Sequence, residues 1–64
     1  MKWLAPTGST QYSADHRYSV TEAVKGIWIA YELGPTTGTE IGRSNSDEGA
    51  RLLCEDQDAF RKRA

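Results

Sequence analysis

Residues 26–34 read Gly-Ile-Trp-Ile-Ala-Tyr-Glu-Leu-Gly, and between the two glycines the stretch is apolar on both sides if it forms a β-strand. Alternate side chains of a strand point to opposite sides of its sheet. One side carries Ile27, Ile29, Tyr31 and Leu33, and the other carries Trp28, Ala30 and Glu32. The rest of the chain supplies one helix, which can cover only one side. The sequence therefore predicts that something else covers the second side.

A further strand is expected before this stretch and another after it. Residues 17–24 alternate in polarity and are rich in β-branched and aromatic residues, which is typical of a strand. Lys25-Gly26 follows as a tight turn, because glycine adopts positive φ angles without strain. Residues 39–43 are expected to form a short third strand, in which Ile41 is the only large apolar residue.

The last part of the chain is predicted to be a helix from about Asp47 to about Lys62. Ser46 can accept a hydrogen bond from an N–H group of the first turn, and the acids Asp47 and Glu48 complement the positive end of the helix dipole. Gly49 is expected to cost up to about 1 kcal/mol relative to alanine. The apolar stripe of this helix consists of Ala50, Leu53, Cys54 and Gln57, flanked by Phe60.

These elements predict an α+β fold, namely a three-stranded antiparallel β-meander with one C-terminal α-helix packed on one face. Residues 1–16 are expected to be an extended N-terminal arm, which is mobile unless Trp3, Leu4 or Tyr12 attaches it to the domain. Residues 17–64 are expected to be a single β-β-β-α domain.

Two arrangements of helix and sheet remain open. In the preferred arrangement the helix covers the side with Ile27 and Ile29, and Trp28 lies on the opposite side among small or polar side chains. Trp28 would then anchor a partner, unless Trp3 and Leu4 fold back over it. The predicted partner-binding residues are Trp28, Tyr31, Tyr18 and Trp3. In the reverse arrangement Trp28 lies beneath the helix, and the isoleucine side is exposed instead.

The composition narrows the ways in which this small domain can be stabilised. A chain of 64 residues buries only about 60% of its unfolded surface. One cysteine rules out an internal disulfide, and one histidine rules out a Cys/His zinc site. Association with a protein partner or a second copy is the remaining route. The chain has no run of apolar residues long enough for a membrane span and no signal-peptide pattern, so we expect a cytoplasmic location.

Residues 26–55 resemble a group of short, uncharacterised proteins of bacteria and their prophages. Their pattern is a hairpin strand with aromatic residues, a short strand that ends in glycine, and a capped helix of the form Ala-Arg-x-x-Cys-Glu. The matching residues are Trp28, Ala30, Tyr31, Leu33, Ile41-Gly42, Asn45-Ser46, Ala50-Arg51 and Cys54-Glu55. The resemblance implies the β-β-β-α fold and carries no known reaction. The element order is also similar to AP2-like and integrase arm-binding DNA readers, at the level of fold alone.

No catalytic, metal or cofactor site is predicted. Cys54 could in principle act as a nucleophile with His16 as base and Asp15 as orienting group. Cys54 falls on the apolar helix stripe, however, where a free cysteine behaves as a small hydrophobe. The acids of the helix point in different directions, so they do not converge on a cation.

The sequence favours a non-enzymatic interaction or accessory protein that docks a sheet face or edge onto a protein partner or onto itself. The alternative is a small nucleic-acid-binding module whose sheet or hairpin enters a groove. Its possible phosphate contacts are Arg17, Lys25, Arg43, Arg61, Lys62 and Arg63. A net charge of −1 and the acids Glu22, Glu32 and Glu40 on or near the sheet disfavour nucleic acid.

Overall fold

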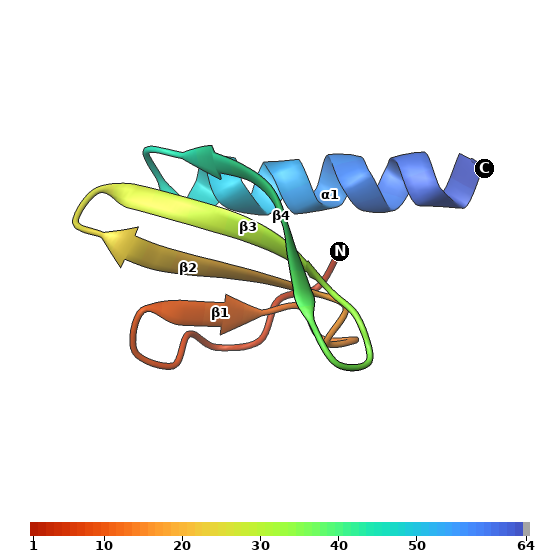
Figure 1. The fold of residues 1–64 in the computed structure, drawn as a ribbon, viewed down its shortest axis with the longest axis horizontal. Helices are drawn as coiled ribbons and strands as arrows, with labels where there is room; N and C mark the ends of the chain where they lie inside the picture. The colour runs from red at the N-terminus through yellow and green to blue at the C-terminus, as the bar shows by residue number, and fades with distance from the viewer. Residues whose placement is uncertain (64) are drawn as a thin grey trace.

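The computed structural model describes residues 1–63 and places four β-strands before one C-terminal α-helix. The elements are β1 (Thr10–Tyr12), β2 (Tyr18–Val24), β3 (Ile27–Leu33), β4 (Gly38–Ser44) and α1 (Asp47–Arg63). Each strand pairs antiparallel with the next, so the order in the sheet is the order in the chain. α1 lies along one side of the sheet, and its last turns extend beyond the strands (Figure 1). The α+β class, the antiparallel sheet and the C-terminal helix are confirmed.

The sheet has four strands and not the three predicted, because part of the N-terminal arm joins it. Thr10 pairs with Thr21, and Tyr12 pairs with Ser19. The arm also folds back on itself, so that Trp3 forms a β-bridge with Ser13. A strand of three residues is too short to show a periodic pattern, and its pairing with β2 depends on contacts outside the segment.

α1 packs on the side of β3 that carries Trp28 and Ala30, so the preferred arrangement was wrong and the reverse arrangement is correct. Ala30 is fully buried against Val20, its partner on β2, and against Ala50 of the helix. Small residues at these positions let the helix backbone approach the sheet closely. Larger side chains on the isoleucine side of β3 would hold the helix further away.

The core between helix and sheet is small. Its fully buried members are Tyr18, Val20, Ala30, Ala50 and Cys54, and Trp3, Trp28, Ile41 and Leu53 pack against them. A β-bulge in β4 contributes to this packing, since the register with β3 shifts between the pairs Ala30–Gly42 and Tyr31–Glu40. Ile41 is the extra residue, and it packs against the core. Gly42 leaves room for Leu53, whose Cδ1 lies 3.2 Å from the position of an added Cβ.

The predicted turn and helix start are confirmed. Gly26 has a φ angle of 85° in the two-residue turn between β2 and β3, which favours glycine. Ser46 caps α1, because its hydroxyl accepts a hydrogen bond of 3.1 Å from the N–H of Gly49. Within residues 1–63 no helix is long and apolar enough to cross a membrane.

Candidate functional site

The side of the sheet opposite α1 forms an apolar surface, which we call the open face. Its apolar residues are Tyr12, Val24, Ile27, Ile29, Tyr31 and Leu33. They point away from the helix because Val20 and Ala30, which alternate with their neighbours along β2 and β3, face the core. Val24, Tyr12 and Ile27 are 61%, 41% and 37% exposed. The centre is closed by contrast, since Ile29 is only 6% exposed.

Two rows of paired residues cross the middle of the open face. The first row consists of Thr10, Thr21, Ile29 and Arg43, and the second consists of Tyr12, Ser19, Tyr31 and Glu40. In each row the large residue on β3 lies beside a small hydroxyl residue on β2. The rows end at charged residues on β4, and these two side chains pair with each other: Arg43 donates hydrogen bonds of 2.9 and 3.3 Å to Glu40. The face therefore carries no net charge along these rows.

Three of the four predicted anchors lie in or against the core instead of on the open face. Tyr18 is fully buried, and Trp28 and Trp3 pack against the core cluster from the helix side. The indole N–H of Trp3 also donates a hydrogen bond of 3.2 Å to Glu55 of α1. A partner cannot reach Tyr18 in this arrangement. Tyr31 alone among the four lies on the open face.

The sequence did not predict that Ile27 and Leu33 lie on the open face, because the preferred arrangement placed their side chains beneath the helix. A signal was present on the other side of the same strand. Glu32 alternates with Trp28 and Ala30, and it forms an ion pair of 2.8 Å with Arg61 near the end of α1. A charge that pairs with the helix marks the side of the strand on which the helix lies.

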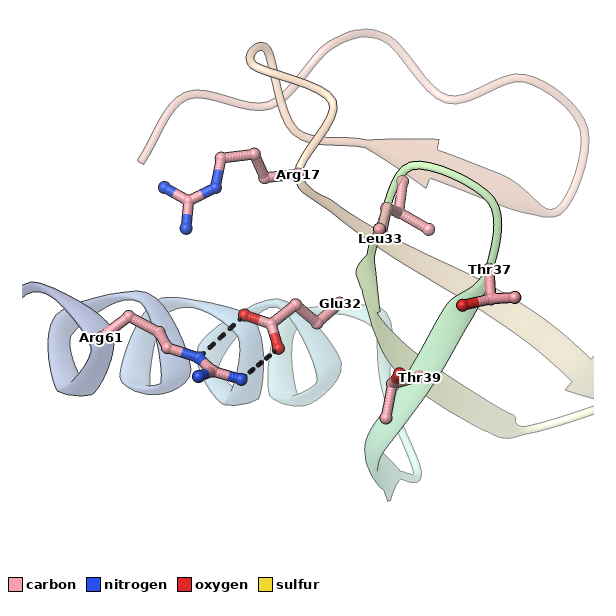
Figure 2. Close-up of a pocket in the computed structure, with 7 residues that line it drawn as sticks. Arg17, Glu32, Leu33, Thr37, Thr39 and Arg61 are labelled. Carbon is pink, nitrogen blue, oxygen red and sulfur yellow. Dashed lines mark hydrogen bonds and ion pairs between the residues drawn. The ribbon is translucent and has the colours of Figure 1, made fainter.

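A cleft of about 310 Å³ lies where the end of α1 faces the loop between β3 and β4 (Figure 2). It is lined by Arg17, Glu32, Leu33, Gly34, Thr37, Thr39 and Arg61. Arg61 donates two hydrogen bonds to the carboxylate of Glu32, of 2.8 and 3.1 Å (Figure 2). The Tyr18 hydroxyl donates a third, of 3.3 Å. The hydrogen bonds from Arg61 are the main cause of a lowered pKa of Glu32.

Two further cations near the end of α1 are also paired with a carboxylate. Arg17 and Lys62 both contact Asp58, at 3.6 and 3.0 Å. Asp58 is 9% exposed, so it lies close beneath these two cations. The cluster fastens the last turns of α1 to the sheet, and its geometry suits that structural role better than the capture of a phosphate.

The predicted phosphate contacts do not form one surface. The structure brings Arg17 and Arg61 together at the cleft, and Lys62 shares the carboxylate of Asp58 with Arg17. Arg43 lies on β4 beside Glu40, Lys25 lies in the turn between β2 and β3, and Arg63 ends α1. A groove-binding module needs its basic groups along one footprint.

The residues considered for nucleophilic catalysis are not brought together. Cys54 is fully buried, with its sulfur 3.9 Å from the carbonyl oxygen of Ser19, and burial raises the pKa of its thiol to about 11. Asp15 accepts a hydrogen bond of 2.7 Å from Ser13 in the loop before β2. His16 is exposed there and lies near the ring of Tyr12. In the part of the chain that the structure describes, no group of three His, Cys, Asp or Glu side chains could hold a metal ion.

Comparisons with protein families, with curated protein sequences and with solved structures gave no match to this chain. The resemblance of residues 26–55 to short bacterial and prophage proteins therefore stays a prediction.

Proposed function

We propose that this protein is a non-enzymatic interaction module that binds another protein surface through the open face. The observation that carries the proposal is the exposure of large apolar side chains on this face, with Val24 at 61% and Ile27 at 37%. Water-exposed large apolar side chains bordered by polar residues are typical of protein interfaces. Tyr31 takes the anchoring place that the sequence gave to Trp28, because an aromatic ring beside small residues offers a large contact area.

The face supports docking better than the edges of the sheet do. β1, at one edge, has only three residues. β4, at the other edge, carries the bulge at Ile41 and the exposed charges of Glu40 and Arg43. Short edge strands, bulges and edge charges are features that prevent another strand from adding to a sheet. Of the two docking modes that the sequence left open, sheet face or sheet edge, we therefore propose the face.

The nucleic-acid alternative has less support. Arg43 and Arg61 are each hydrogen-bonded to a glutamate, and Asp58 pairs with Arg17 and Lys62. A phosphate would have to displace these carboxylates before it gained a contact. We expect no binding of duplex DNA at about 10 μM protein and low salt, well inside the range of ordinary non-specific binding.

The proposal is tested with Tyr31→Ser, which removes the aromatic ring from the open face. We expect the variant to lose binding to a partner purified from the source cell, or to lose self-association, with a weakening of about tenfold or more. The matched control is Leu52→Ser, which removes a side chain that is 54% exposed on α1. Titration calorimetry gives the dissociation constants, and circular dichroism checks that both variants are folded. Equal binding by the wild type and Tyr31→Ser would contradict the proposal.

A further inference from the structure

We propose that residues 1–12 form a strap that opens as one unit while the rest of the domain stays folded, and that its opening uncovers the outer edge of β2. This edge of the sheet is separate from the open face. None of residues 1–12 is buried: Trp3, Thr10 and Gln11 are half-buried, and the others are exposed. Ser13, by contrast, is fully buried, and its N–H donates a hydrogen bond of 2.9 Å to a carbonyl oxygen of β2. Ser13 therefore forms a fixed base at which the strap ends.

One side chain latches the strap to the core. Trp3 is the only apolar residue of the strap that packs against the core cluster, and its indole N–H donates a hydrogen bond of 3.2 Å to Glu55 of α1. A second contact with α1 is polar, since Gln11 accepts a hydrogen bond of 2.9 Å from Arg51. A segment with few buried apolar contacts opens at a lower free energy than the domain as a whole. The strap meets this condition, and Trp3 is its main attachment.

The core keeps its other members when the strap opens. These members come from β2, β3, β4 and α1, and they are Tyr18, Val20, Trp28, Ala30, Ile41, Ala50, Leu53 and Cys54. Helix and sheet therefore remain in contact without Trp3. Leu53 lies against Gly42 of β4, at the edge of the sheet opposite β1. Its packing does not depend on the strap.

Opening turns β2 from an inner strand into an edge strand. In the closed state Thr10–Tyr12 pair with β2, and the N–H of Glu22 donates a hydrogen bond of 2.9 Å to the carbonyl oxygen of Ser9. These partners leave with the strap, so backbone groups of β2 then face water. β2 has seven residues, whereas β1 has only three. Because a bare edge strand is a template for pairing with another chain, the closed strap guards this edge.

Amide hydrogen exchange of the full chain, followed by NMR, tests the proposal. The reporters are the N–H of Leu4, which donates to Tyr12 within the strap, and the N–H of Glu22, which reports on the edge of β2. In the wild type the two amides should be protected to a similar degree, because one opening exposes both. Both should exchange at least about tenfold faster than the amides of β3, which need global unfolding. Equal protection of Glu22 and β3 would overturn the inference.

Three variants separate the strap from the core. Leu53→Ala weakens the core outside the strap, so exchange in β3 should speed up by about tenfold or more while Glu22 exchanges as in the wild type. Trp3→Ala weakens the latch, so exchange of Glu22 should speed up by about tenfold or more. The matched control is Leu4→Ala, which removes a side chain that is 42% exposed and should change the Glu22 rate by less than about threefold.

The decisive comparison is Glu22 against β3 in Leu53→Ala. If this variant speeds the exchange of Glu22 as much as that of β3, strap and domain open together and the inference fails. Ile41→Val, a smaller change in the same core, allows the same comparison if Leu53→Ala does not fold.

Discussion

Gly49 is unfavourable by helix propensity and yet required by its surroundings. It lies in the first turn of α1, where its N–H donates to the capping hydroxyl of Ser46. An added Cβ would collide with the hydroxyl of Ser44 and would lie 3.0 Å from its Cβ. The close approach of the helix start to the end of β4 therefore depends on the missing side chain.

Gly49→Ala should lower the free energy of unfolding by about 1 kcal/mol, because the overlap with Ser44 costs about 1–3 kcal/mol and the gain in helix propensity is at most about 1 kcal/mol. Urea denaturation followed by tryptophan fluorescence measures the change. Ser44→Gly in the same chain removes the overlapping atoms, so the double variant should recover part of the loss. If Gly49→Ala alone is more stable than the wild type, helix propensity is the larger effect.

Cys54 should react with a thiol reagent only when the protein unfolds. The side chain is fully buried, and burial raises its thiol pKa to about 11. In the folded state a reagent therefore cannot reach the sulfur, and little of the thiol is ionised to the reactive thiolate. The rate of reaction with a chromogenic disulfide should rise with urea in parallel with global unfolding. The control is Leu52→Cys, whose exposed thiol should react at once while Cys54 stays unmodified. Rapid modification of the native wild type would show that the core opens locally.

At the scale of elements, the end of α1 is held by ion pairs more than by apolar contacts. Ala50 and Cys54 anchor the first half of the helix in the core, whereas Phe60 is 63% exposed. The last turns, which extend past the strands in Figure 1, are held to the sheet by Arg61 on Glu32 and by Arg17 on Asp58. Their attachment should therefore respond to pH and salt.

Acid should weaken the attachment of α1 through Glu32. Arg61 holds the pKa of this carboxyl below its usual value of 4.5, so the unfolded chain takes up the proton first as the pH falls. The stabilisation is complete above about pH 4.5 and is lost as the pH falls through the lower folded-state pKa. Glu32→Gln should consequently lose less stability than the wild type between about pH 6 and about pH 3, measured by urea denaturation. Asp56→Asn, which removes an exposed carboxylate from the outer side of α1, should behave like the wild type.

The N-terminal arm helps this short chain to cover its single hydrophobic core. The arm adds β1 to the sheet and sends Trp3 to the helix side, where its indole ring packs against the core and bonds to Glu55. Gln11 of β1 likewise accepts a hydrogen bond of 2.9 Å from Arg51 of α1. These contacts join the two ends of the sequence on the helix side. They do not extend over the open face.

Much of the fold could be predicted from local patterns, because those patterns act within a few residues. Glycine at the hairpin turn, alternation along β2 and β3, and serine before two acids at the helix start each specify local structure. The candidate site was harder to predict. β3 is apolar on both sides, so its pattern is compatible with a helix on either side. We expected the helix on the side with the larger aliphatic residues, and this expectation was wrong.

The sequence by itself determined the order of β2, β3, β4 and α1, the turn at Gly26 and the cap at Ser46, since each depends on backbone conformation and hydrogen bonds between neighbours. The strand β1 was missed, because its place in the sheet depends on pairing with β2. Only the tertiary structure decided which side of β3 is buried. The helix lies where Ala30 and Gly42 permit close packing and where Glu32 meets Arg61. The stretch from Ile27 to Leu33 is thus divided by packing: Trp28, Ala30 and Glu32 face the helix, and Ile27, Ile29, Tyr31 and Leu33 lie on the open face.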